Sequence, residues 1–140
     1  MKIAFRCDAS ERGGTGHVMR CLTLARAAMT QGHEVCFFVS DIDAALEKRI
    51  NATGIRIIRL PSLEYGCQQS SVAIEAEYET SQQETEARCF LSTVAGYQHD
   101  WIVVDHYGYG EPWISAVKRA GYCVLLIEDW PHRKVSADLL

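Results

Sequence analysis

Short apolar runs alternate with segments of helical periodicity along the chain. The apolar runs are rich in Val, Ile and Phe and are almost continuous, as expected for strands that are buried on both faces. An alternation of this kind is typical of a parallel sheet wrapped by helices. The strands predicted in this way cover residues 2–7, 34–39, 55–60, 100–105 and 122–128.

Helices are predicted between these strands. In the first of them, Val18, Leu22 and Ala25 fall on one face. In the last, Pro112 stands in the first turn, where a proline is tolerated best. The predicted helices cover about residues 17–31, 42–52, 79–94 and 111–120, and residues 62–78 are predicted to form a long loop.

The pattern as a whole predicts a single α/β domain over residues 1–140, with a doubly wound, Rossmann-like parallel sheet. Its apolar content of 48% and its charged content of 23% are ordinary for a globular domain. The final residues, Asp138-Leu139-Leu140, resemble the entry to another buried strand. Because units of this kind often form one half of a cleft, a second domain or subunit is an expected partner.

Charge and cysteine usage exclude several classes of function. A net charge of −4 argues against nucleic acid or an anionic membrane as a partner. No apolar stretch reaches the length of a membrane span and the N-terminus does not resemble a signal peptide, so a cytoplasmic protein is expected. The six cysteines show neither a C-x-x-C pair nor zinc-ligand spacing. We therefore expect reduced thiols, no metal and no cofactor.

A glycine-rich turn connects the first strand to the first helix. Its residues Gly14, Thr15 and Gly16 would let the backbone approach a ligand closely, and the helix N-terminus behind them offers amides to an anion. The turn is neither a dinucleotide fingerprint, because Met19 stands at the third glycine position, nor a P-loop. These three residues are predicted to bind substrate.

His17 directly follows the last glycine, and Arg20 lies on nearly the same side of the helix. The positive end of the helix dipole disfavours an imidazolium by about 0.3–1 kcal/mol, which favours a neutral imidazole. Such a histidine suits a general base that activates water. The alternative is that His17 only caps the helix or binds a phosphate.

Further polar residues follow other predicted strands at the edge where open α/β sheets bind ligands. Asp8 could cap the glycine turn, orient His17 or bind a sugar hydroxyl, and Asp105 could line a pocket or cap the next turn. The residues expected to converge at this edge are Arg6, Asp8, His17, Asp105 and Asp129, with His106 and Tyr107 beside them.

Three segments together resemble the UDP-sugar hydrolases of pseudaminic acid biosynthesis. The segments are Arg6-x-Asp8-x-Ser10, then Gly14-x-Gly16-His17-Val18-Met19-Arg20-Cys21-Leu22, and Asp100-Trp101-Ile102-Val103-Val104-Asp105-His106-Tyr107. The resemblance implies hydrolysis of UDP-2,4-diacetamido-2,4,6-trideoxy-β-L-altropyranose to the free sugar and UDP. It also implies that His17 is the base, that Arg6, Asp8 and Arg20 line the cleft, and that residues 105–107 form the second motif.

The same resemblance implies a GT-B arrangement of two Rossmann-like domains, of which this chain matches the N-terminal one. The second domain, which binds most of the UDP in that family, has no counterpart in these residues. The chain also departs from the family at Glu128 and Trp130, where the family tends to read Ile-Asp-Asp-Leu-Ala.

Two other functions fit the same features. The first is a GT-B glycosyltransferase, whose N-terminal domain also opens with a glycine-rich turn and a histidine. The second is a non-catalytic half that binds a sugar or assembles with a separate C-terminal subunit. In all three cases we expect weak binding of UDP by this chain, and self-association through apolar surface at residues 130–140.

Overall fold

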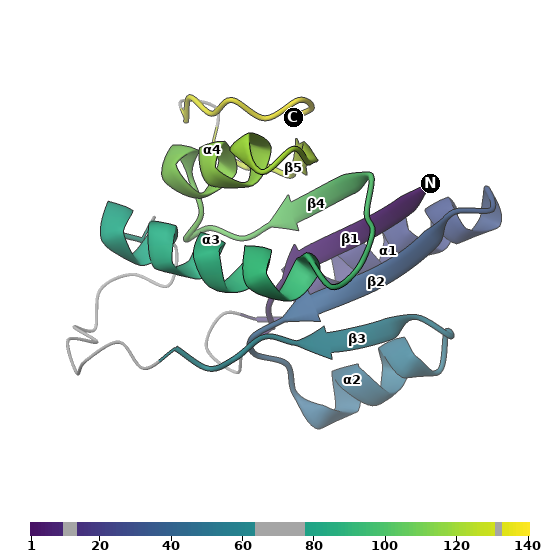
Figure 1. The fold of residues 1–140 in the computed structure, drawn as a ribbon. Coiled ribbons are helices and arrows are strands. Elements are labelled where there is room, and N and C mark those ends of the chain that lie inside the picture. The colour runs from purple at the N-terminus through teal and green to yellow at the C-terminus, as the bar shows by residue number, and fades with distance from the viewer. Residues whose placement is uncertain (10–13, 64–77, 131–132) are drawn as a thin grey trace.

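The computed structural model describes residues 1–9, 14–63, 78–130 and 133–140 of the chain. In chain order the elements are β1 (Lys2–Cys7), α1 (Gly16–Thr30), β2 (Glu34–Val39), α2 (Ala44–Asn51), β3 (Arg56–Arg59), α3 (Thr80–Val94), β4 (Trp101–Asp105), α4 (Glu111–Arg119) and β5 (Cys123–Leu126). The five strands form one parallel sheet in the order β3-β2-β1-β4-β5 (Figure 1). The predicted doubly wound α/β fold is confirmed.

Helices cover both faces of the sheet. Figure 1 shows α3 in front of the sheet and α1 behind it. On the front side, Phe90 of α3 and Trp113 of α4 pack with Phe38, Ile102 and Val104 of the strands. The residues that pack on the other side include Val18, Leu22, Leu46 and Ile50 of α1 and α2, together with Phe5, Phe37 and Val103 of the strands. Two apolar layers therefore enclose the sheet.

Successive residues of a strand point to opposite faces, and this alternation sorts the polar residues at the strand ends. On β1, Phe5 packs in the layer of α1 and α2, whereas Ala4 packs in the layer of α3 and α4. On β4, Val103 and Val104 divide in the same way. Consecutive polar residues at the end of each strand therefore point to opposite sides of the sheet.

Two element boundaries differ from the prediction by two residues, and the other differences are of one residue. The helix expected from residue 42 begins at Ala44, because the side chain of Asp43 caps it and accepts a hydrogen bond of 2.8 Å from the amide of Leu46. The last strand ends at Leu126 instead of residue 128, and Glu128 forms an ion pair with Arg133. The cap at Asp43, which the apolar pattern does not encode, sets the first of these boundaries.

The last residues of the chain pair with β5. A parallel bridge joins Leu125 to Leu139, and the amide of Leu126 donates to the carbonyl of Leu139 at 3.0 Å. The predicted strand-like entry is present, but Leu139 and Leu140 are 52% and 74% exposed instead of buried. This exposed pair lies in the segment from which self-association is predicted.

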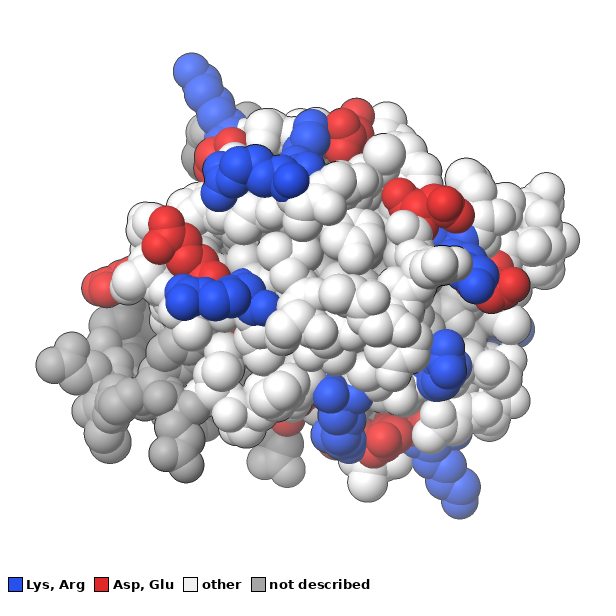
Figure 2. Space-filling view, viewed as in Figure 1, with Lys and Arg blue, Asp and Glu red and all other residues white. Residues whose placement is uncertain are grey.

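Charge on the visible surface is mixed. On the face shown in Figure 2, basic and acidic side chains lie near one another around the margin, and the centre is largely uncharged. Within the part of the chain that the structure describes, no helix combines the length and apolar character needed to cross a membrane. The five described cysteines, Cys7, Cys21, Cys36, Cys89 and Cys123, are free thiols, and Cys67 lies outside the described residues.

Candidate functional site

The N-terminal end of α1 places the first candidate residues. Gly14 has a φ of +74°, a conformation that favours glycine, and the chain then enters the helix at Gly16. The carbonyl of Thr15 accepts a hydrogen bond of 2.9 Å from Met19. Among the described residues, no atom lies within 4 Å of the position that a Cβ would take at Gly14 or Gly16. The earlier part of the turn, residues 10–13, lies outside the described residues.

His17, in the first turn of α1, contacts Asp105 at the end of β4. Its Nδ1 lies 2.5 Å from Oδ1 of the carboxylate. The imidazole is 14% exposed and the carboxylate 1% exposed, so the contact is shielded from water. A carboxylate at Nδ1 holds the proton on that nitrogen and leaves the lone pair of a neutral imidazole on Nε2. This is the orientation that a general base requires.

Arg20 lies one turn further along α1 and joins two strand ends. Its Nε and Nη2 each donate to the carboxylate of Asp105 at 2.7 Å, and its Nη1 donates to Asp129 at 2.9 Å. These hydrogen bonds raise the pKa of Arg20 above its ordinary value and lower the pKa of Asp129 below its own. The guanidinium therefore stays charged and ties β4 to the segment after β5.

Tyr107 completes this arrangement from the loop after β4. Its hydroxyl donates a hydrogen bond of 2.9 Å to Asp129. Its ring is almost perpendicular to the imidazole of His17, with 4.5 Å between the ring centroids. We call the five residues His17, Arg20, Asp105, Tyr107 and Asp129 the His17 cluster.

A second group of residues lies on the α3 and α4 side of the sheet and is centred on Asp8. The Nη1 of Arg6 lies 2.8 Å from Oδ1 of Asp8, and Nε2 of His106 lies 3.3 Å from Oδ2. The same carboxylate accepts hydrogen bonds from the amides of Ser40 and Asp41 after β2. We call Arg6, Asp8 and His106 the His106 cluster.

The partners of His106 define its protonation state. The amide of Gly108 donates to Nδ1 at 3.0 Å, so the proton of the neutral ring lies on Nε2, which faces Asp8. Burial lowers the pKa of His106 below its ordinary value, against the opposing effect of Asp8. Burial alone would raise the pKa of Asp8, but Arg6 and His106 hold it well below the ordinary value. His106 is therefore a neutral hydrogen-bond donor with both nitrogens engaged.

Arg6 is almost fully buried, with 1% of its surface exposed. Besides Asp8, its guanidinium donates to the hydroxyls of Ser40 and Tyr109, at 3.0 and 2.6 Å. The stacked rings of Tyr109 and His106, with centroids 4.0 Å apart, cover the ion pair. The side chain of Arg6 thus binds other protein groups, and direct contact between it and a substrate stays a prediction.

The predicted convergence at the carboxyl ends of the strands is confirmed, but in two groups. Asp105, and not Asp8, holds His17, because the alternation along β4 directs Asp105 towards α1. Asp8 instead binds backbone amides of the turn after β2, a function that was not among those expected for it. The binding functions of Gly14, Thr15, Gly16 and the two clusters stay predictions.

Several residues at the site were not predicted. Glu128 and Arg133 form an ion pair of 3.2 Å and are only 10% and 11% exposed. Trp130 stacks on Tyr107, and Tyr109 covers Arg6. Trp130 could have been found from the sequence, because it is an aromatic residue that directly follows the carboxylate Asp129 after the last strand. No sequence periodicity indicates the pairing of Glu128 with Arg133.

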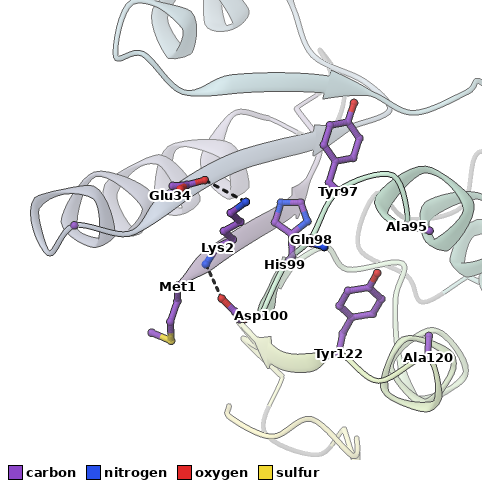
Figure 3. A pocket seen from close by; sticks show the side chains of 11 residues that line it. Met1, Lys2, Glu34, Ala95, Tyr97, Gln98, His99, Asp100, Ala120 and Tyr122 are labelled. Carbon is purple, nitrogen blue, oxygen red and sulfur yellow. Dashed lines mark hydrogen bonds and ion pairs between the residues drawn. The ribbon is translucent and has the colours of Figure 1, made fainter.

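The structure also has a hollow of about 670 Å³ at the opposite edge of the sheet (Figure 3). Lys2, Tyr97, His99 and Tyr122 are among the residues that line it, and none belongs to either cluster. Lys2 is held there by Glu34 at 3.7 Å. Across residues 1–9, 14–63, 78–130 and 133–140, no group of three or more His, Cys, Asp or Glu side chains is arranged to hold a metal ion.

Comparison with known proteins bears on the fold. No family model and no curated protein matches the sequence. Among solved structures, the chain is similar to Acinetobacter baumannii MurG (TM-score 0.61, 15% identity), to Phytolacca americana UGT2 (0.65, 14%) and to the glycosyltransferase VinC bound to dTDP (0.50, 15%). The aligned part covers 89%, 89% and 90% of this chain, and 34%, 28% and 34% of those proteins.

The chain has the Rossmann-like fold of a GT-B glycosyltransferase domain. At identities of 14–15% this likeness describes the fold alone. The chain spans about a third of the length of these proteins.

Proposed function

We propose that this GT-B-type domain carries the general base of an enzyme that uses a nucleotide sugar, and that His17 is the base. The observation that supports this most strongly is the contact between His17 and Asp105. A buried carboxylate fixes Nδ1, and the exposed part of the ring stands at the tip of a helix behind the glycine turn. Residues 105–107 and the glycine turn are also the segments that resemble the UDP-sugar hydrolases.

The proposed reaction is a single displacement at the anomeric carbon. Nε2 of His17 takes the proton of a hydroxyl group while the oxygen of that group forms a bond to C1 of the sugar. The bond from C1 to the diphosphate oxygen breaks, and the nucleoside diphosphate leaves with the electron pair. Asp105 stabilises the imidazolium formed in this step, and general-base assistance of this type contributes about 10²–10⁴-fold.

Two nucleophiles fit this scheme. The likeness to GT-B glycosyltransferases supports a hydroxyl group of an acceptor, which would make the reaction a glycosyl transfer. The sequence motifs around His17 and Tyr107 support water, which would make it hydrolysis of a UDP-linked diacetamido-trideoxy sugar with inversion. The base, its orienting carboxylate and the bond that breaks are the same in both.

The nucleotide is proposed to bind largely to a second Rossmann-like domain. Both arginines of the two clusters are already held by carboxylates: Arg6 by Asp8, and Arg20 by Asp105 and Asp129. A diphosphate would have to compete with these ion pairs. We therefore expect this chain alone to bind UDP weakly or not at all, and titration calorimetry that gave a micromolar dissociation constant would contradict this.

The experiment supplies the chain with a second GT-B domain, fused or added as a separate chain, and offers UDP- and dTDP-linked sugars with and without acceptors in H₂¹⁸O. Mass spectrometry then separates the two reactions. Hydrolysis gives a free sugar that carries ¹⁸O, and transfer gives a glycosylated acceptor without ¹⁸O.

His17→Asn should lower kcat by about 10²-fold or more with little change in KM, because the amide cannot accept the proton. His33→Asn, a histidine outside both clusters, is the matched control and should leave kcat unchanged. If His17→Asn kept kcat within about threefold of the wild type, His17 would not be the base. If the chain bound the sugar but gave no turnover with any of the second domains, sugars and acceptors, the result would instead support a non-catalytic domain that binds a sugar.

A further inference from the structure

The segment after β5 packs against the loop after β4 through an aromatic pair. The rings of Trp130 and Tyr107 are nearly parallel, with an angle of 8° between the planes and 5.1 Å between the centroids. The guanidinium of Arg133 lies over the ring of Trp130, 5.0 Å from its centroid. Trp130 thus contacts two charged or aromatic groups through the faces of its indole.

Trp130 is itself held in place by a nearly buried ion pair. The side chain of Glu128 accepts a hydrogen bond of 2.9 Å from the amide of Trp130, and it pairs with Arg133 at 3.2 Å. Arg133 also donates to the backbone carbonyls of Tyr107 and Tyr109. The side chains of Trp130 and Arg133 therefore contact the loop after β4, at the ring of Tyr107 and at two backbone carbonyls.

Tyr107 connects this segment to His17. One end of the tyrosine is held by the hydrogen bond from its hydroxyl to Asp129, and its ring stands 4.5 Å from the imidazole. The contact between Nδ1 of His17 and Asp105 fixes one atom of the imidazole but still allows the ring to rotate about that contact. A second group against the side of the ring removes this freedom, and Tyr107 is the described residue in that position.

We propose that Trp130 is a positioning residue for His17, which acts by holding the ring of Tyr107 against the imidazole. The significance of this for catalysis rests on the proposed function, in which His17 is the base. The physical coupling between Trp130 and His17 is independent of the proposed function, because it is present in the chain without substrate. Trp130 stands at a position where the chain departs from the proteins that its motifs resemble.

The test uses nuclear magnetic resonance on the chain itself, without substrate. Protons near an aromatic ring are shifted by its ring current, so the ring protons of His17, assigned with His17→Asn, report the position of Tyr107. Tyr107→Leu gives the chemical shifts of the His17 ring protons when the Tyr107 ring is absent. Trp130→Leu keeps an apolar side chain but removes the stacking face, and Trp130→Phe restores an aromatic face.

We expect Trp130→Leu to move the His17 signals at least half of the way towards their positions in Tyr107→Leu, and Trp130→Phe to leave them near the wild type. Trp101→Leu, at the opposite end of β4, is the matched control and should leave them unchanged. In Tyr107→Phe, which lacks the hydrogen bond to Asp129, the signals should stay close to the wild type because Trp130 still holds the ring.

Equal spectra for Trp130→Leu and the Trp101→Leu control would overturn the proposal, as would equal displacements in Trp130→Leu and Trp130→Phe. If Trp130→Leu does not fold, Tyr107→Phe decides: it removes the hydrogen bond to Asp129 and leaves Trp130 as the group that holds the ring. A large displacement in Tyr107→Phe alone would then show that Asp129, and not Trp130, holds the ring. These experiments measure no turnover. Their results can therefore be interpreted even if the proposed enzymatic function is wrong.

Discussion

His17 and Asp105 are 88 positions apart in the sequence, and their side chains meet with Nδ1 of the imidazole 2.5 Å from Oδ1 of the carboxylate. Asp105→Asn replaces one of the acceptors with an amide that can donate to the imidazole, which favours the wrong tautomer. We expect kcat to fall by about 10²-fold or more, with a smaller change in KM. Steady-state kinetics of the chain combined with a second GT-B domain measures this.

The control for this prediction is Asp129→Asn. Asp129 shares Arg20 with Asp105, but its described hydrogen bonds are to Arg20 and Tyr107 and not to His17, so its loss should reduce kcat by less than about tenfold. Equal losses in the two variants would mean that Asp105 acts through Arg20 instead of through the imidazole.

Arg6 is expected to stabilise the fold through Asp8. Arg6→Met would leave the carboxylate of Asp8 without its buried partner, and breaking such a pair costs about 3–5 kcal/mol. Arg59→Met, which breaks a surface pair with Glu47, should cost about 1 kcal/mol or less. Urea denaturation of the two variants compares the costs, and similar values would argue against a structural function of Arg6.

Stability should fall as the pH is lowered from about 7 towards 5, the range in which an unfolded histidine takes up a proton. Burial lowers the pKa of His106 in the folded state, so the unfolded chain binds more protons in this range and acid favours unfolding. His106→Gln should therefore show a shallower loss of stability with falling pH than the wild type.

Thermal melts across that pH range measure the effect. His99, whose pKa is also lowered by burial, should contribute a second part, so His106→Gln/His99→Gln should flatten the dependence further. An unchanged pH dependence in His106→Gln would show that this ring can be protonated in the fold at little cost.

Gly108 is expected to tolerate no side chain. A Cβ at this position would lie 2.6 Å from the ring of Tyr78. Tyr78 is held by a hydrogen bond from its backbone amide to the carbonyl of Gly108 and by a ring contact with His106. Gly108→Ala should cost about 1–3 kcal/mol of unfolding free energy. Gly96→Ala, where the nearest atom lies 3.6 Å away, should change it by about 0.5 kcal/mol or less.

The rescue variant for this prediction is Gly108→Ala in a Tyr78→Ala background. Without the ring of Tyr78 the added methyl group has room, so the cost of the glycine substitution should largely disappear. Denaturation curves of the four chains of this cycle show whether it does, and a cost that persists would place the strain in the backbone.

The fold was accessible to prediction because its elements follow from the hydrophobic pattern. All five strands and four helices were expected from the alternation of buried runs and helical faces. The error at the start of α2 arose because a single side-chain contact, the cap by Asp43, decides that boundary. Residues 64–77, within the predicted loop, lie outside the described residues.

The sequence predicted where the site residues lie better than it predicted which of them contact one another. Strand ends of a parallel sheet meet at one edge, so the convergence of Asp8 and Asp105 with His17 followed from topology alone. Which carboxylate meets His17 depends on the face to which each residue points, and the two-residue period of β4 was the signal that could have decided it. The choice between water and an acceptor hydroxyl depends on groups that bind the nucleophile, and no motif in these residues specifies them.

Asp105 and His106 are neighbours in the sequence but serve opposite sides of the sheet. The consequence is that the two pH responses of the protein can be tuned independently. A substitution around Asp105 would alter the profile of activity against pH, while a substitution around Asp8 would alter the acid tolerance of the fold. If His17 is the base, as proposed, replacing His106 would extend the acid tolerance of the fold without changing the residues that contact His17.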